Sequence, residues 1–196
     1  ALNSWTPLHY AAAYNQVKTL HMLVTTLGCK PDCKDGMGST PLHVAAGEGH
    51  LESIAALIHL GCSAQVVDNE GCNALYCAVA WNRIAAVRLL EGLGCSVNHT
   101  SHEGRTPVHV AAEQGMVDLL DVLVTELGCP VDRDDMYSFT PLHSAANGGQ
   151  VEAIQKLVQL GHPLDCRDYL GKAPLHYAAM HGRVAALKEL AAEGAM

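Results

Sequence analysis

The chain has 196 residues, of which 49% are apolar and 16% are charged, and its formal net charge is −8 at pH 7. An average soluble domain carries about 25% charged residues, so this apolar composition excludes an intrinsically disordered segment. Uninterrupted apolar runs are only a few residues long, whereas a membrane-spanning helix needs about 20 residues. The Lys and Arg residues are scattered singly, which disfavours a nucleic-acid backbone as the main partner, because phosphate binding needs clustered cations.

A four-residue motif recurs six times along the chain, at steps of 34, 33, 33, 34 and 33 residues. Threonine followed by proline is typical of a helix start, because the hydroxyl can cap free N–H groups and proline suits the first helical position. Asparagine can still cap in the third copy, whereas alanine in the sixth cannot. The six copies are Thr6–His9, Thr40–His43, Asn73–Tyr76, Thr106–His109, Thr140–His143 and Ala173–His176.

Each copy then predicts two helices followed by a turn. Nine residues after the first motif position comes a residue that tolerates the left-handed conformation, and it ends a short first helix: Asn15, Gly49, Asn82, Gly115, Gly149 or Gly182. Apolar residues at helical spacing predict a second helix, which ends at another glycine: Gly28, Gly61, Gly94, Gly128, Gly161 or Gly194. The first and fourth copies carry one extra residue before that glycine, which explains their longer steps.

Four of the eight cysteines occupy one position of this period, directly after the glycine that ends the second helix: Cys29, Cys62, Cys95 and Cys129. Equivalent positions of stacked repeats lie about 10 Å apart, beyond the ~7 Å Cα separation that a disulfide can bridge. Free cysteine packs as a small hydrophobic residue. We therefore expect reduced cysteines and a cytoplasmic protein, with the nucleus as the alternative location.

The motif T-P-L-H-x-A at a 33-residue period resembles the ankyrin-repeat family. The resemblance covers residues 1–196 and implies an all-α ankyrin-repeat solenoid of about six helix–turn–helix repeats with β-hairpin fingers, forming a single domain. The expected repeats span residues 1–34, 35–67, 68–100, 101–134, 135–167 and 168–196. Because the first repeat is incomplete and the last helix lacks a distinctly polar outer face, we expect a segment excised from a longer chain.

The sequence predicts no catalytic, metal or cofactor site. Five of the twelve histidines occupy the motif position, where the family resemblance implies a structural hydrogen bond to the backbone of the adjacent finger: His9, His43, His109, His143 and His176. The cluster Cys95, His99 and His102 lacks the fourth ligand of a tetrahedral zinc site. Nucleophile-elbow, phosphate-loop and zinc-protease motifs are absent, so we expect no enzymatic activity.

All nine aromatic residues lie in predicted fingers or first helices. The family resemblance places these segments on a concave face where partners bind, and aromatic residues dominate interface hot spots. Six of the rings occupy positions that are polar in other copies. With three methionines and one arginine, they form the predicted partner-binding set: Trp5, Tyr14, Met37, Trp81, Arg105, Met136, Tyr137, Phe139, Tyr169 and Met180.

These observations favour a protein–protein interaction scaffold that acts as a monomer. Its partner would be a protein or peptide with apolar anchors and a mildly basic character, and neither nucleic acid nor direct membrane insertion is expected. The alternative is a regulatory or substrate-docking ankyrin segment of a larger enzyme or channel. The setting of Asn98, with Leu90 upstream and Val97 before it, is similar to asparagines hydroxylated in ankyrin repeats; the alternative for Asn98 is ordinary turn chemistry.

Overall fold

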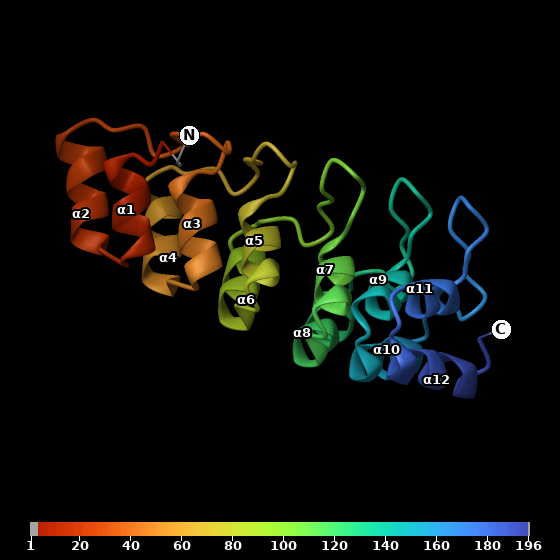
Figure 1. The fold of residues 1–196 in the computed structure, drawn as a ribbon. Helices are drawn as coiled ribbons and strands as arrows, with labels where there is room; N and C mark the ends of the chain where they lie inside the picture. Colours follow the sequence, from red (N-terminus) through yellow and green to blue (C-terminus); the bar gives the residue numbers. More distant parts are fainter. Residues whose placement is uncertain (1–3, 196) are drawn as a thin grey trace. The chain divides into compact units, whose positions relative to one another are not determined.

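The computed structural model describes residues 4–195, which contain twelve α-helices, two π-helical segments and no named strand (Figure 1). They divide into two compact units, one ending at His99 and the other beginning at Thr100. The first unit contains α1 (Pro7–Ala13), α2 (Val17–His21), η1 (Met22–Thr26), α3 (Pro41–Glu48), α4 (Leu51–His59), α5 (Ala74–Ala80) and α6 (Ile84–Gly92). The second contains α7 (Pro107–Glu113), α8 (Val117–Asp121), η2 (Val122–Glu126), α9 (Pro141–Gly148), α10 (Val151–Gln159), α11 (Pro174–Met180) and α12 (Val184–Ala192).

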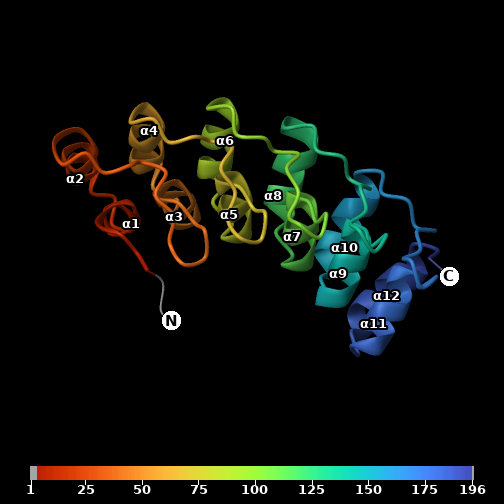
Figure 2. The ribbon, with the colours of Figure 1, turned by 90° about the horizontal axis from the view of Figure 1, so that it is seen from above.

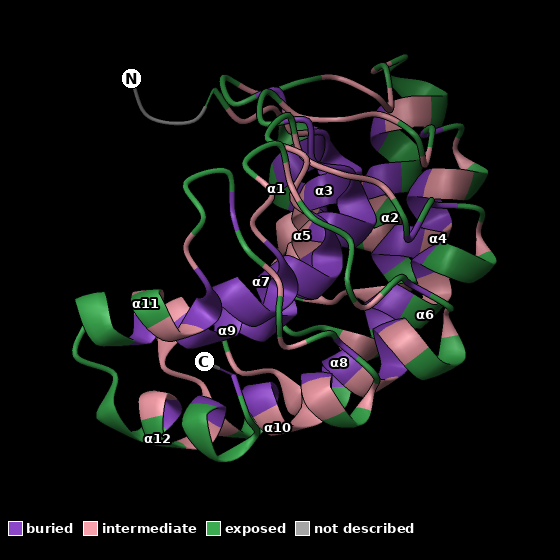
Figure 3. Cartoon of the chain, turned by 90° about the vertical axis from the view of Figure 1, so that its right-hand side faces the viewer, coloured by how far each residue is buried: buried purple, intermediate pink, exposed green. Residues whose placement is uncertain are grey.

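Each unit is built from pairs of helices that stack in two rows. In the first unit α1, α3 and α5 pack in one row, while α2, α4 and α6 form the row behind it (Figure 2). In the second unit α7, α9 and α11 form one row, and α8, α10 and α12 form the other. The leucine of the motif is buried wherever another pair follows it in the same unit, as Leu8, Leu42 and Leu142 show. Burial is extensive on α7 and α9 (Figure 3).

The predicted helix starts are confirmed, and the motif histidine takes part in the cap in five of the six copies. In α7, the Thr106 hydroxyl accepts a hydrogen bond from the His109 N–H at 3.4 Å, while Nδ1 of His109 accepts one from the Thr106 N–H at 3.1 Å. The Thr106 hydroxyl oxygen also lies 2.8 Å from Nδ1 of His109. In α5 the Asn73 side chain accepts from the Tyr76 N–H at 2.9 Å. Side-chain caps of this kind satisfy N–H groups that the helix leaves free.

The motif histidines of α1, α3, α7 and α9 also tie their helix to the next finger. Nε2 of His43 lies 3.0 Å from the Cys72 carbonyl oxygen, and Nε2 of His109 lies 2.8 Å from that of Phe139. His9 and His143 make equivalent bonds to the next finger of their own unit. Burial lowers the pKa of His109 to about 4, which keeps the imidazole neutral at physiological pH. The predicted structural role is therefore confirmed for His9, His43, His109 and His143. In the last copy, Nδ1 of His176 accepts a hydrogen bond from the Ala173 N–H at 3.1 Å.

The extra residue of the first and fourth copies is absorbed by a π turn. In a regular copy, the N–H after the final glycine bonds five residues back, from Cys62 to the Leu57 carbonyl at 2.9 Å. In the fourth copy, Cys129 bonds six residues back, to Leu123, also at 2.9 Å. One wide turn adds one residue without shifting the rest of the helix. The terminal glycine therefore keeps its left-handed conformation, with φ of 68° at Gly128.

The expected hairpin fingers are turned loops with little strand pairing. Within the described residues, the recorded β-bridge is the isolated antiparallel pair Val67 and Asn73. Four of the fingers are instead shaped by an aspartate, whereas Ser101 occupies the equivalent position in the finger before α7. Oδ1 of Asp35 accepts hydrogen bonds from the N–H groups of Met37 and Ser39 at 2.8 and 2.9 Å. The same pattern occurs at Asp68, Asp135 and Asp168.

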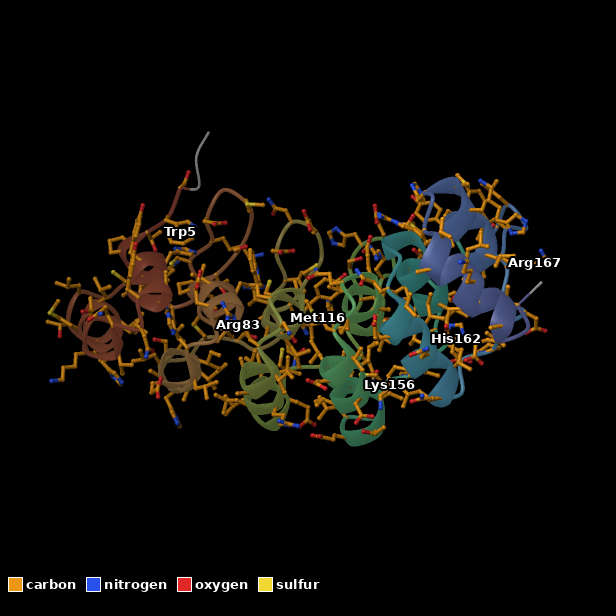
Figure 4. All side chains as sticks on the ribbon, turned by 60° about the horizontal axis from the view of Figure 1, so that its bottom comes forward. Trp5, Arg83, Met116, Lys156, His162 and Arg167 are labelled. Atoms are coloured by element: carbon orange, nitrogen blue, oxygen red, sulfur yellow. The ribbon has the colours of Figure 1, made fainter. Side chains whose placement is uncertain are left out.

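None of the eight cysteines, all within the described residues, forms a disulfide, and four of them are buried: Cys62, Cys72, Cys95 and Cys129. Burial raises the pKa of Cys129 to about 11, so this thiol is protonated at neutral pH. In the fifth copy His162 replaces the cysteine and is buried in the second unit (Figure 4). Its Nδ1 lies 2.7 Å from the Pro163 carbonyl oxygen, and burial lowers its pKa. Across residues 4–195, the helices are too short or too polar to cross a bilayer.

Candidate functional site

The first unit carries a surface cavity of about 230 Å³, here named the first-unit cavity. Trp81, the first residue after α5, is 67% exposed and lines it. The indole lies against the preceding helix: a Cβ added to Gly47 in α3 would sit 3.2 Å from Cδ1 of Trp81. The absence of a side chain at this glycine leaves room for the ring. The other lining residues are Trp5, Asp35, Met37, Ser39, His43, Val44, Glu48 and Cys77.

Trp5 is half-buried against its own repeat (Figure 4). Its ring meets Tyr10 edge to face at a centroid distance of 5.2 Å and lies 6.3 Å from the imidazole of His9. Tyr14, at the end of α1, is 69% exposed. Together with Trp5 and Tyr10, it lines a separate groove of about 510 Å³. The predicted rings Trp5 and Tyr14 therefore share one surface, while Trp5 also borders the first-unit cavity.

The second unit carries an aromatic cavity of about 340 Å³, here named the second-unit cavity. Tyr137 and Tyr169, on neighbouring finger tips, have ring centroids 5.7 Å apart and planes inclined by 45°. Phe139 is half-buried and meets the Tyr177 ring edge to face at 5.0 Å. The tyrosines thus form the open part of the cavity and Phe139 forms its wall. The remaining lining residues are Glu103, Arg105, Glu113, Asp135, Asn147 and Asp168.

Negative charge dominates the second-unit cavity, since four carboxylates face one guanidinium. Nη2 of Arg105 pairs with Oε2 of Glu113 at 2.6 Å. The Tyr177 hydroxyl donates to Oδ2 of Asp168 at 2.5 Å. Burial acts to raise the pKa of Asp168, but this hydrogen bond and two backbone N–H donors lower it overall. Burial and the same carboxylate raise the pKa of Tyr177 to about 12, so Asp168 is ionised and Tyr177 neutral at physiological pH.

The structure distributes the predicted binding residues over several surfaces. Trp5, Met37 and Trp81 meet at the first-unit cavity. Arg105, Tyr137, Phe139 and Tyr169 meet at the second-unit cavity. The side chains of Met136 and Met180 are 62% and 59% exposed, and neither residue lines one of these two cavities.

Six lining residues of the second-unit cavity were missing from the predicted set: Glu103, Glu113, Asp135, Asn147, Asp168 and Tyr177. The sequence marks Asp135 and Asp168 as turn formers, and it places Tyr177 at a position that tolerates packing. These three residues converge because successive copies stack, which places the finger of one copy beside the finger and first helix of the next. The sequence does show that Asp135 and Asp168 are one repeat period of 33 residues apart, which predicts equivalent positions on neighbouring fingers.

Asn98 lies in an exposed turn after α6. Leu90 and Val97, the two apolar residues that define its setting, are both buried. The side chain is therefore accessible while its flanking segment is anchored. Among the described residues, no group of three or more His, Cys, Asp or Glu side chains is placed to hold a metal ion.

Solved structures share this arrangement of helices. The ankyrin repeat domain of human ASB11 aligns with a TM-score of 0.82 at 26% identity, covering 98% of this chain and 85% of that one. An ankyrin repeat domain from Acinetobacter baumannii AYE aligns with a TM-score of 0.77 at 26% identity, covering 97% and 98%. A chain in the complex of a Bdellovibrio bacteriovorus predatory endopeptidase with its immunity protein has a TM-score of 0.82 at 22% identity, over 97% and 99% of the two chains. This last likeness concerns the fold alone.

Curated relatives match over a shorter stretch. The chain is 44% identical to NF-kappa-B inhibitor alpha of Rattus norvegicus over 52 residues, and 42% identical to that of Homo sapiens over the same length. The matched stretch is 26% of this chain and 16% of either relative. The family model for ankyrin repeats (3 copies) matches residues 8–101, 88–168 and 109–196. The chain is therefore a member of the ankyrin-repeat family and has the all-α ankyrin-repeat solenoid fold.

Proposed function

We propose that the chain is a protein-binding scaffold whose partner lies on the fingers and first helices, the segments that line the concave face in this family. Ankyrin repeats generally mediate protein–protein interaction, and the relatives matched by sequence are named as inhibitors of NF-kappa-B. The observation that carries the proposal is the exposure of Trp81 beside a cavity. Large exposed aromatic rings at a cavity are typical of binding hot spots.

The chemistry of the two cavities supports a partner with apolar anchors and a mildly basic character. In the first-unit cavity, the rings of Trp5 and Trp81 and the thioether of Met37 offer apolar contact, while Asp35 and Glu48 add negative charge. The second-unit cavity combines further rings with an excess of carboxylates. A polypeptide that presents apolar and cationic side chains complements both surfaces. The function proposed is binding without catalysis, by a monomer in the cytoplasm or nucleus.

The helix pairs are proposed to be six repeats of a single domain. Each pair begins at one copy of the motif, and the boundaries fall near residues 1–34, 35–67, 68–100, 101–134, 135–167 and 168–196. Limited proteolysis tests this organisation, because cuts within one domain would be confined to exposed loop tips.

Photocrosslinking in a cell extract tests the proposed face directly. A photoreactive phenylalanine analogue is placed at Trp81 in one variant and at Met22 in another. Met22 is an exposed apolar residue of the second-helix row, so it serves as the matched control. We expect a discrete crosslinked polypeptide from position 81, competed by unlabelled chain, and none from position 22. Crosslinking from position 22 alone would place the interface on the opposite row and contradict the proposal.

Asn98 is proposed as a site of β-hydroxylation by an asparaginyl hydroxylase, because it is exposed in a turn whose flanking apolar residues are anchored. Mass spectrometry of the chain purified from cells should then show the gain of one oxygen atom on the peptide that contains Asn98. The variant Asn98→Ala should lack that species. An unmodified peptide from cells that express the hydroxylase would contradict the assignment.

A further inference from the structure

We infer that the second-unit cavity binds an arginine side chain of the polypeptide partner, with the guanidinium held between tyrosine rings and carboxylates. The inference rests on the proposed function, because it assumes that a polypeptide lies across the fingers. It adds a specific ligand group and a specific site to that proposal.

The two finger-tip tyrosines provide the aromatic surface. Tyr137 is 45% exposed and Tyr169 is 65% exposed, and both line the cavity. The N–H of Tyr169 donates to the Tyr137 carbonyl at 3.0 Å, so the backbone holds the two rings in register. Their planes are inclined by 45°, which means that they do not cover one another completely. Each ring therefore keeps surface on which a planar cation can stack.

Two of the cavity carboxylates retain hydrogen-bonding capacity. Oδ1 of Asp135 accepts from the N–H groups of Tyr137 and Phe139 at 2.8 and 3.0 Å, whereas Oδ2 has no recorded donor among the described residues. The carboxylate of Glu103 is exposed, and it too has no recorded donor within the described part of the chain. Asp168, in contrast, accepts from Tyr177 and from two backbone N–H groups. The carboxylates of Glu103 and Asp135 are thus the candidates to meet an incoming cation.

One cation in the wall of the cavity and one beside it already make both of the required kinds of contact. The guanidinium of Arg105 forms an ion pair with Glu113 at 2.6 Å. Nζ of Lys172 lies 5.6 Å from the centroid of the Tyr177 ring, a cation–π distance. The four carboxylates of the lining outnumber Arg105 and Lys172 together. The surface therefore complements a further positive charge.

Arginine fits this chemistry better than lysine or an apolar residue. A guanidinium is planar, stacks on aromatic rings and forms paired hydrogen bonds with a carboxylate, whereas an ammonium acts as a point charge. An apolar side chain would exclude water from Glu103 and Asp135 without pairing them, which is unfavourable. The first-unit cavity differs because two indoles and a methionine dominate it, so it is suited to an apolar anchor.

The test is an NMR titration of the full chain with three small probes. These are N-acetyl-arginine amide, its uncharged isostere N-acetyl-citrulline amide, and N-acetyl-lysine amide. We expect saturable shifts of the ring signals of Tyr137 and Tyr169 with the arginine probe. Binding should be about threefold weaker for lysine and at least tenfold weaker for citrulline. Tyr14, an exposed tyrosine of the first unit, should not shift.

Two variants locate the interaction, and one variant controls for surface changes. Glu103→Gln and Tyr169→Ala should each weaken binding of the arginine probe at least threefold, while Met22→Ala should leave it unchanged. All three residues are exposed, so the unfolding temperature should stay close to that of the original chain. Equal binding of citrulline and arginine, or an affinity insensitive to Glu103→Gln, would overturn the inference.

The result is distinguishable from failure of the proposed function. If crosslinking from position 81 captures a partner but the arginine probe does not bind the second unit, the scaffold proposal stands and the arginine site is wrong. If the probe binds as expected but no partner crosslinks from position 81, the second unit has a guanidinium site, but the proposed placement of the partner at Trp81 is wrong.

Discussion

Two helical glycines illustrate how strongly the local surroundings decide the effect of a substitution. Gly92 lies in α6, and a Cβ added there meets no heavy atom within 4 Å. Gly148 lies in α9, where an added Cβ would overlap the carbonyl oxygen of Glu113 and crowd the side chain of Gln150. Both positions are helical, so helix propensity alone favours alanine over glycine at each by up to about 1 kcal/mol. The overlap reverses this preference at Gly148.

We predict that Gly92→Ala raises the free energy of unfolding by about 0.5 kcal/mol, because it only reduces the freedom of the unfolded chain. Gly148→Ala should lower it by about 1–3 kcal/mol, since the added methyl group forces the backbone apart. Urea unfolding followed by circular dichroism measures both. A stabilised Gly148→Ala variant would show that α9 can move away from Glu113 without loss.

For single residues, the sequence predicts which side chains are exposed better than it predicts which side chains contact one another. Comparison of equivalent positions across the copies identifies Trp81 and Tyr169 correctly as exposed. It does not reveal that Tyr177 donates to Asp168, because that contact depends on the path of a finger over a helix. It also leaves Phe139 among the anchors, although the ring is half-buried against Tyr177.

The second helices show how one element tolerates an insertion. Deleting Thr125 from the chain makes the fourth copy equal in length to the fifth, which contains the regular helix α10. We predict that the deletion variant folds and that its free energy of unfolding changes by less than about 1 kcal/mol. The reason is that a regular α-helical turn replaces η2, while Leu123 and Cys129 keep their buried positions.

The matched control is deletion of Gln155 from α10. Here the removed residue has no π turn to absorb the change, so every later position rotates by about 100°. Leu157 would leave the core, and the second unit should lose cooperative unfolding. Thermal melts of the two variants measure the difference. Equal stability loss in both would indicate that η2 is not the site of the insertion.

At the element scale the repeat period predicts helix starts and ends closely, because caps and left-handed residues recur in every copy. The sequence shows that the first and fourth copies have one extra residue. It does not show whether that residue widens a turn of the helix or lengthens the following loop. The fingers depart most from expectation. Their aspartates bond the N–H groups that a β-ladder would use, so the finger remains a turned loop.

For the whole molecule, the buried histidines make stability depend on pH. Burial lowers the pKa of His109 to about 4, and burial also lowers the pKa of His43, His143 and His162. In the unfolded chain each titrates near 6.5. Their contribution to stability is present above pH 6.5 and is lost as the pH falls toward the folded-state pKa, because the unfolded state then binds more protons.

We therefore predict that the urea midpoint falls between pH 7 and pH 4.5, with the free energy of unfolding decreasing by about 1 kcal/mol or more. A control variant, His181→Gln, changes an exposed histidine and should show the same fall as the original chain. NMR titration of His109 provides a second readout. A midpoint that stays constant or rises on acidification would contradict the burial of neutral imidazoles.

The most direct test of the scaffold is the affinity of the captured partner for the original chain and for Trp81→Ala. Loss of a central aromatic anchor should weaken binding by about 2 kcal/mol, roughly 30-fold in Kd. Met22→Ala should bind like the original chain, and the unfolding temperature of Trp81→Ala should be nearly unchanged, since its ring is 67% exposed. An unchanged Kd, or a Trp81→Ala variant that no longer folds, would contradict the assignment of this residue to the binding surface.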